Sequence, residues 1–235
     1  MTDFQQHFRI TGFQGQDYLM MPQAISMADF CIRKYKTRDP FEIIDRRNIE
    51  LRWFDGRNLL GYFRVVNRQQ YIGLNCNAED GALRTGAGHE LGHSFLDYAS
   101  ASCGMLFQDA MLYSLNNSRS ERNANLFDAE LLIPDEYILG RIYYEEYSRL
   151  VQYIQENMDK YKSDRARFEF EQEQMMEFYQ GHQDMGTFEN LAEEMNVDVH
   201  LVGFKLQCLR AKGLDLPNVP ETRSDFLKSW QKRQY

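Results

Sequence analysis

A His-Glu-x-x-His motif constrains this chain more than any other feature of its sequence. It lies within residues 88–94, where His89 and His93 are one helical turn apart. An α-helix turns about 100° per residue, so these imidazoles project from one face and can share a tetrahedral metal ion. Glu90 lies about 60° around the helix from His93, where it can take a proton from a water molecule without binding the metal. The motif therefore predicts a catalytic metal site.

The alternative is a chance match on an ordinary amphipathic helix. The chain has only five His residues, so a chance pair at this spacing is improbable. Apolar residues around the motif recur at helical spacing and predict a buried helix from about Leu83 to Tyr98. Gly88 and Gly92 are poor helix formers, but small residues there would let another backbone or a substrate strand approach the metal. This context favours the metal site.

A second motif supplies the missing ligand. Glu121-x-x-Ala124-Asn125 lies in a segment whose apolar positions fit a helix that ends near Pro134. A carboxylate oxygen of Glu121 would complete a set of two His and one Glu, as in one large class of catalytic zinc sites. Asn125 could hydrogen-bond a ligand imidazole and fix its tautomer. Taken alone, Glu121 would instead be a first-turn carboxylate, because Ser118 and Glu121 have capping-box spacing. Opposite a helix that lacks a third ligand, we expect Glu121 to bind the metal.

Together, these two motifs resemble the ImmA/IrrE family of metallopeptidases. The resemblance extends to four further segments, which are Asn48–Trp53, Gly61–Phe63, Tyr71–Asn75 and Leu191–Asp198. It covers most of residues 20–217 but finds no match near residues 136–186. One departure lies at Thr85–Gly88, where the family more often has an apolar pair and Ala before the first His.

The resemblance implies that His89, His93 and Glu121 bind one zinc ion and that Glu90 is the general base. It also implies a protein substrate, typically a helix-turn-helix repressor of a phage or mobile element, whose cleavage relieves repression. Manganese or iron is an alternative to zinc. A second hypothesis is a non-catalytic, zinc-containing regulatory protein that acts by binding a repressor or DNA. The intact Glu90 favours the enzyme, because a purely structural site needs ligands but no base.

The hydrophobic pattern predicts an α+β fold that is mostly helical. A small β-sheet should pack on the zincin-like helix that carries the first motif, with a helix-turn-helix-like subdomain towards the C-terminus. The expected helices lie at 22–36, from Asp39-Pro40 through Ile44, and at 137–161, 163–180, 187–196 and 198–212. A strand is expected at 49–54, and a hairpin at 59–66 and 71–74 around a loop at 67–70. An edge strand in this position could bind an extended peptide.

Four regions follow from this pattern: a metallopeptidase domain at 1–135, a helical insertion at 136–186, the helix-turn-helix-like subdomain at 187–217 and a flexible basic tail at 218–235. The insertion begins with an aromatic stripe. Such a stripe could be a binding surface, but it is more often part of a core.

Charge and composition limit the partners. The net charge of −8 argues against binding to nucleic acid or to an anionic membrane. Residues 184–217 include six acidic and three basic residues, so we expect this segment to contact protein and not DNA. No apolar run approaches the ~20 residues that cross a bilayer, and the N-terminus lacks the pattern of a secretory signal. The four Cys residues are scattered, as expected for reduced thiols in a cytoplasmic protein.

Overall fold

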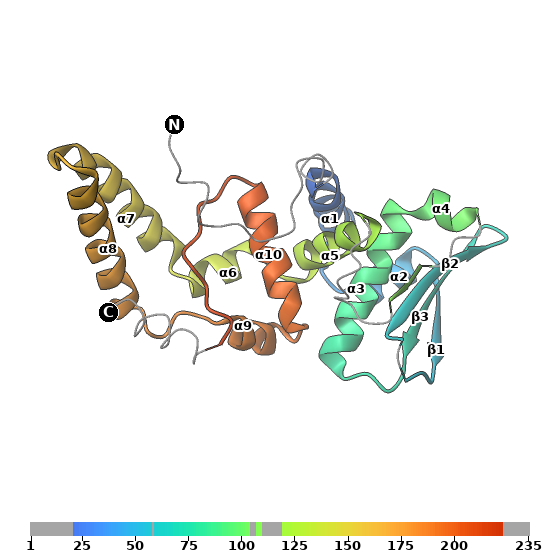
Figure 1. Ribbon diagram of the computed structural model, residues 1–235. Helices are drawn as coiled ribbons and strands as arrows, with labels where there is room; N and C mark the ends of the chain where they lie inside the picture. The colour runs from blue at the N-terminus through green and yellow to red at the C-terminus, as the bar shows by residue number, and fades with distance from the viewer. Residues whose placement is uncertain (1–20, 58, 104–106, 110–118, 223–235) are drawn as a thin grey trace.

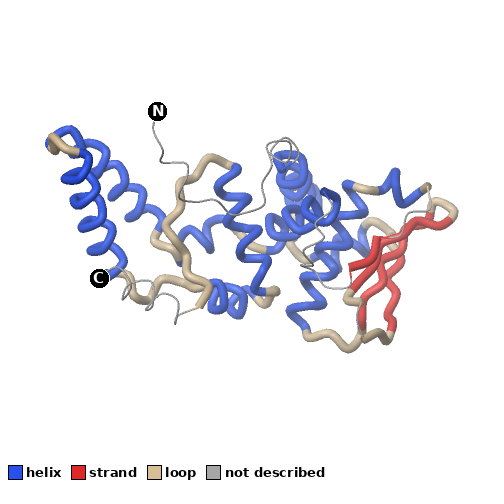
Figure 2. The backbone as a smooth tube through the Cα atoms, viewed as in Figure 1, coloured by secondary structure: helices blue, strands red, loops and turns tan. Residues whose placement is uncertain are grey.

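The computed structural model describes residues 21–57, 59–103, 107–109 and 119–222 (Figure 1). The predicted capping residue Ser118 lies outside these ranges, as does the part of the predicted tail that follows Thr222. A β-sheet lies at one end of the molecule, and a hairpin of two helices lies at the other end (Figure 2). The helices that form most of the core lie between them. The predicted α+β, mostly helical fold class is confirmed.

The sheet is mixed and has the strand order β1-β3-β2-β4. Its strands are β1 (Glu50–Phe54), β2 (Gly61–Val66), β3 (Gln69–Asn75) and β4 (Phe107–Asp109). β1 runs parallel to β3, whereas β2 runs antiparallel to both β3 and β4. The predicted hairpin therefore occupies the middle of the sheet, and the edge strands of the described sheet are β1 and β4. The sequence pattern did not predict β4.

The turn between β2 and β3 is shorter than predicted. Asn67 and Arg68 have φ angles of +50° and +66°, as in the two-residue turns that match the twist of a hairpin. Gln69 and Gln70 belong to β3 and not to the loop. The polar character of residues 67–70 concealed this, because an exposed strand end has the same composition as a loop.

The described parts of the chain contain ten α-helices and one short 3-10 helix. They are α1 (Met21–Tyr35), α2 (Pro40–Arg46), α3 (Asp80–Leu96), α4 (Tyr98–Ser102), α5 (Arg119–Leu132), α6 (Asp135–Arg141), α7 (Tyr144–Asn157), η3 (Met158–Lys160), α8 (Asp164–Gly181), α9 (Phe188–Met195) and α10 (Val199–Ala211). Each of these helices is too short or too polar to cross a membrane.

The core is built around α3 and α5. One side of α3 packs on β2 and β3, and another side packs on α5, which in turn contacts α1 and α10 (Figure 1). Phe63, Leu91 and Phe127 bring apolar side chains from the sheet, α3 and α5 into one buried cluster. At Gly92 the two helices are so close that a Cβ would lie 3.1 Å from the Cα of Ala124. The absence of a side chain at Gly92 therefore allows the backbone of α5 to approach α3 closely.

The single helix predicted at 137–161 is wrong. The chain breaks after α6, where Tyr143 adopts a left-handed conformation with φ of +53°, and α7 then runs in a new direction. The amide of Gly186 donates a hydrogen bond to the Arg141 carbonyl at 3.0 Å, which replaces a bond within the helix. Ile142 and Tyr147 are buried on either side of the break, so the apolar period continues through it. This burial supports the interpretation of the stripe as core.

α9 and α10 form the predicted helix-turn-helix-like pair. Asn196 ends α9 in the left-handed region, and the Asp198 side chain caps α10 by accepting a hydrogen bond from the amide of His200. α10 is buried against α5 along most of its length, with Leu201, Leu206 and Leu209 in the core. Its position in the motif is that of a recognition helix, but its apolar face is already covered. The region boundaries stay a prediction.

Candidate metal centre

The first predicted motif lies on the buried half of α3. His89, Glu90 and His93 have exposed fractions of 0%, 1% and 1%. Leu91, between them in sequence, is also fully buried because α3 is covered by both the sheet and α5. Tertiary packing on several sides compensates for the low helix propensity of the glycines in this segment. The helix thus presents its polar motif inside the protein.

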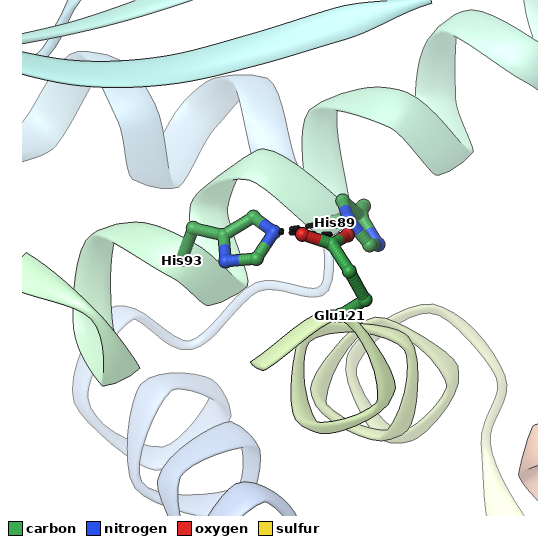
Figure 3. A group of neighbouring side chains, drawn as sticks. All are labelled: His89, His93 and Glu121. Atoms are coloured by element: carbon green, nitrogen blue, oxygen red, sulfur yellow. Dashed lines mark hydrogen bonds and ion pairs between the residues drawn. The ribbon is translucent and has the colours of Figure 1, made fainter. Parts of the chain in front are cut away.

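Glu121, in the first turn of α5, meets the two histidines of α3 (Figure 3). Its Oε2 atom lies 3.0 Å from His89 Nε2 and 3.4 Å from His93 Nε2. The two Nε2 atoms are 3.1 Å apart. In a tetrahedral zinc site with bonds of about 2.0–2.1 Å, adjacent ligand atoms lie about 3.3 Å apart. The three side chains therefore fit a tetrahedral metal ion, and the fourth position is left for water or substrate.

Each histidine is oriented through its other ring nitrogen. His89 Nδ1 lies 2.7 Å from Oδ1 of Asn125, the predicted partner of a ligand imidazole. His93 Nδ1 lies 2.8 Å from Oδ2 of Asp97, which also accepts a hydrogen bond from Ser120 Oγ at 2.7 Å. When Nδ1 donates in this way, the lone pair of Nε2 is available to a metal. The spacing of four residues between His93 and Asp97 is a local signal from which this partner could be predicted.

The charges at the site favour a bound cation. Burial lowers the pKa of His93, but hydrogen bonds to Asp97 and Glu121 oppose this effect and raise it to about 10. Burial raises the pKa of Glu121, but hydrogen bonds to His89 and His93 outweigh it, so the pKa lies well below its usual range. Without a metal, the site therefore holds a proton among its acceptors. A divalent cation would replace that positive charge.

The Glu90 carboxyl group lies against the backbone of β2. A Cβ placed on Gly61 would be 2.8 Å from Oε1 of Glu90. The strand therefore approaches the carboxyl group more closely than a residue with a side chain at position 61 would permit. Gly61 pairs with Asp109 of β4, so the β4 edge borders the strand that contacts Glu90. In the sequence, Gly61 is recognisable only as part of a predicted strand.

The departure at Thr85–Gly88 has a local structural cause. A Cβ on Gly88 would overlap Oδ1 of Asp128, a fully buried residue of α5. Thr85 Oγ1 accepts a hydrogen bond from the amide of Asp198 at 3.0 Å and donates to the carbonyl of Gly81 at 2.9 Å. Thr85 thus joins α3 to the start of α10. Polar and small residues at these positions suit the neighbours that they contact.

Comparison with known proteins agrees with this geometry. A sequence model of the IrrE N-terminal-like domain, Peptidase M78, matches residues 45–206. These residues contain the whole His89, His93 and Glu121 cluster and most of α10. The chain belongs to this family. The resemblance to ImmA/IrrE metallopeptidases is therefore confirmed, and His89, His93 and Glu121 form the candidate metal site of this metallopeptidase.

One similar protein comes from a phage. The chain is 32% identical over 105 residues to "Uncharacterized immunity region protein 2" of Bacillus phage phi105. The aligned part is 44% of this chain and 64% of that protein, so the chain spans somewhat less than two thirds of the relative's length.

Proposed function

We propose that this protein is a zinc-dependent endopeptidase that cleaves a regulatory protein, specifically a helix-turn-helix repressor of a phage or mobile element. The observation that carries the proposal is the convergence of His89, His93 and Glu121, with the buried carboxyl group of Glu90 on the same helix. Membership of a metallopeptidase family supports the reaction type. The relative from a phage immunity region supports a regulatory substrate.

The residues divide the chemistry between them. His89, His93 and Glu121 would hold zinc, which when bound supplies a Lewis acid for water and for the scissile carbonyl. Glu90 accepts the proton of the attacking water and returns it to the departing amine. Asn125 keeps the His89 ring in the orientation that a ligand needs. Two His and one carboxylate also suit iron, but the tetrahedral spacing of the three ligand atoms and the neighbouring Glu90 favour zinc.

The substrate would bind as an extended segment along β4. This edge strand lies between an added peptide and β2, whose Gly61 contacts Glu90, so the peptide would run along the edge of the sheet nearer to the general base. Addition of a strand uses backbone hydrogen bonds and tolerates varied side chains. Specificity for one repressor would then depend on contacts outside the strand.

The alternative is a non-catalytic protein that binds a repressor or DNA and keeps zinc for structure. The position of Glu90 favours the enzyme. Its carboxyl group is almost fully buried, and its charge acts on the ring of His93. A structural zinc site needs ligands but no such base.

Glu90→Gln distinguishes the peptidase from the non-catalytic binding protein. The variant keeps the size of the side chain but removes the base, so the cleavage rate should fall by a factor of about 10² to 10⁴ or more. The repressor encoded nearest to the gene for this protein is incubated with each variant, and fragments are followed by mass spectrometry. Zinc content and repressor binding should stay at wild-type values.

Two further variants complete this experiment. Glu79→Gln changes an exposed Glu next to the start of the same helix and should cleave like wild type. Glu121→Ala should lose most of its zinc together with activity. Cleavage by Glu90→Gln at the wild-type rate would remove Glu90 from the mechanism. If Glu90→Gln relieved repression in cells as well as wild type does, the non-catalytic alternative would replace the peptidase.

A further inference from the structure

A chain of hydrogen bonds connects one histidine of the metal cluster to a second helix. Ser120 Oγ donates to Oδ2 of Asp97 at 2.7 Å, and the same oxygen lies 2.8 Å from Nδ1 of His93. Ser120 Oγ is also 3.4 Å from Nδ1 of His93, so the three groups form a compact triangle. The side chain of His93 is 1% exposed and that of Asp97 is 18% exposed. Neither Asp97 nor Ser120 belongs to the candidate ligand set.

The backbone holds Asp97 in place for this contact. Asp97 follows the last residue of α3, and its amide donates a hydrogen bond to the His93 carbonyl at 2.9 Å. Its carbonyl accepts from the amide of Ala101 at 3.0 Å as α4 begins. The residue therefore joins two helices, and its backbone is fixed one helical turn from His93.

The chemistry of a carboxylate suits the role of tautomer selector. An ionised carboxylate only accepts hydrogen bonds, so the proton of a neutral His93 ring must lie on Nδ1. The lone pair of Nε2 then points towards the other two atoms of the cluster, His89 Nε2 and Glu121 Oε2. An amide in place of Asp97 could rotate and donate to Nδ1, which would place the proton on Nε2 and block a metal.

We propose that Asp97, anchored by Ser120, is a positioning residue of the metal centre that selects the metal-binding tautomer of His93 and aligns α3 with α5. Ser120 immediately precedes Glu121, so the Ser120–Asp97 hydrogen bond places the carboxylate of α5 opposite the histidines of α3. The inference rests on the metal site of the proposed function, but it does not depend on which protein is cleaved.

Metal affinity measures this role directly. Metal-free protein is titrated with Zn²⁺ in competition with a chromophoric chelator, for wild type, Asp97→Asn and Ser120→Ala. Loss of a partner of this kind typically weakens binding by about 10–100-fold, and we expect this for Asp97→Asn. Ser120→Ala keeps the carboxylate and should weaken binding by less than about tenfold. Asp80→Asn removes an exposed Asp from the other end of α3 and should match wild type.

Cobalt provides a signature that a merely structural role would not change. In protein loaded with Co²⁺ alone, the exchangeable Nδ1 protons of His89 and His93 should give two shifted proton resonances. Asp97→Asn should move or broaden the resonance of His93 and leave that of His89 in place. The thermal midpoint of each metal-free variant is measured alongside.

Each result has one meaning. Weaker zinc binding, an altered His93 resonance and an unchanged metal-free midpoint support the proposal. Wild-type affinity and spectrum in Asp97→Asn overturn it, and so does a loss of affinity that follows a lowered metal-free midpoint, because Asp97 would then only support the fold. If wild-type protein itself bound neither metal, the metal site of the proposed function would fail first.

Discussion

The carboxyl group of Asp128 lies against α3 at Gly88, where that helix has no side chain. The residue is fully buried, and neither carboxyl oxygen has a hydrogen-bond partner among the described residues. Burial raises its pKa well above the ordinary value, with an opposing effect from Arg84. A buried polar group without a hydrogen-bond partner is costly, and the cost is smaller for a carboxyl group that keeps its proton. The contact at Gly88 is one residue from His89 in sequence.

Gly88 and Asp128 should behave as a coupled pair. Gly88→Ala places a methyl group on the Asp128 carboxyl group and should lower the free energy of unfolding by about 1–3 kcal/mol. Asp128→Ala in the same chain removes the overlap, so the double variant should recover at least ~1 kcal/mol relative to the sum of the single variants. Urea unfolding of the four proteins gives this coupling. Gly140→Ala, where a Cβ meets nothing within 4 Å, is the control and should not destabilise. Additive effects would show that the two positions are independent.

Asp128 should also make stability depend on pH. Its raised pKa means that the folded protein keeps a proton which the unfolded chain releases above pH ~3.9. The bound proton therefore contributes fully to the free energy of unfolding below pH ~3.9. This contribution is lost as the pH rises towards the pKa of the folded protein, by up to ~1.4 kcal/mol per pH unit. Asp128→Asn removes this loss, so its stability relative to wild type should increase between pH 5 and pH 8. Urea midpoints at several pH values test this, and a constant difference would contradict it.

At the scale of elements, a partly buried network of charges ties α10 and the residue that follows it to α5 and α6. Lys205 Nζ donates to Oε2 of Glu130 at 2.9 Å and also to Asp135, although the lysine side chain is 0% exposed. Lys212 Nζ contacts Oε1 of Glu130 at 2.5 Å and Oδ2 of Asp135 at 2.7 Å. Each carboxylate oxygen in the network thus has a cationic partner. One face of the helix that resembles a recognition helix is therefore part of the interior.

Lys205→Met should destabilise the protein strongly. It removes the buried cation and leaves Glu130 with only Lys212, and breaking a buried ion pair on one side typically costs about 3–5 kcal/mol. Lys212 is 26% exposed, so Lys212→Met should cost clearly less. Chemical denaturation of both variants makes the comparison. Equal and small losses would mean that the network contributes little to the attachment of α10.

At the scale of the whole molecule, charge and burial together oppose DNA binding. The chain has a net charge of −8, and the apolar face of α10 is covered by α5. Lys205, one of the two basic residues within α10, is fully buried, so the outer face of this helix offers little positive charge to phosphate. The hairpin of α7 and α8 projects from the body at the end opposite the sheet (Figure 1).

Gel-shift experiments at physiological salt should therefore show no tight, sequence-specific binding to duplex DNA. Specific DNA-binding proteins typically have dissociation constants of about 10⁻⁸–10⁻¹¹ M under these conditions, and most of that affinity depends on cationic contacts with phosphate. Duplexes that span the control region of the neighbouring repressor gene are the appropriate probes. A nanomolar, sequence-selective shift would reverse this view of α9 and α10.

The starts of several helices were predicted well, because the signals for a helix start act over a few residues. Asp39, Ser163, Thr187 and Asp198 each cap the helix that follows them, as their residue types indicate. The break at Tyr143 was missed, because a reversal at one residue leaves the apolar period on both sides intact. β4 was missed because a strand of three residues has no period to detect.

The sequence by itself determined the residues of the candidate metal centre, because the spacing of His89, Glu90 and His93 places them on neighbouring positions of any helix. It also indicated Glu121 as the missing carboxylate. Only the tertiary structure decided that Glu121 lies about 3 Å from both imidazoles, that Asp97 and Ser120 orient one of them, and that Asp128 requires Gly88. Most of these contacts join residues more than 20 positions apart, and their distances depend on how α3 and α5 pack, which no local pattern specifies.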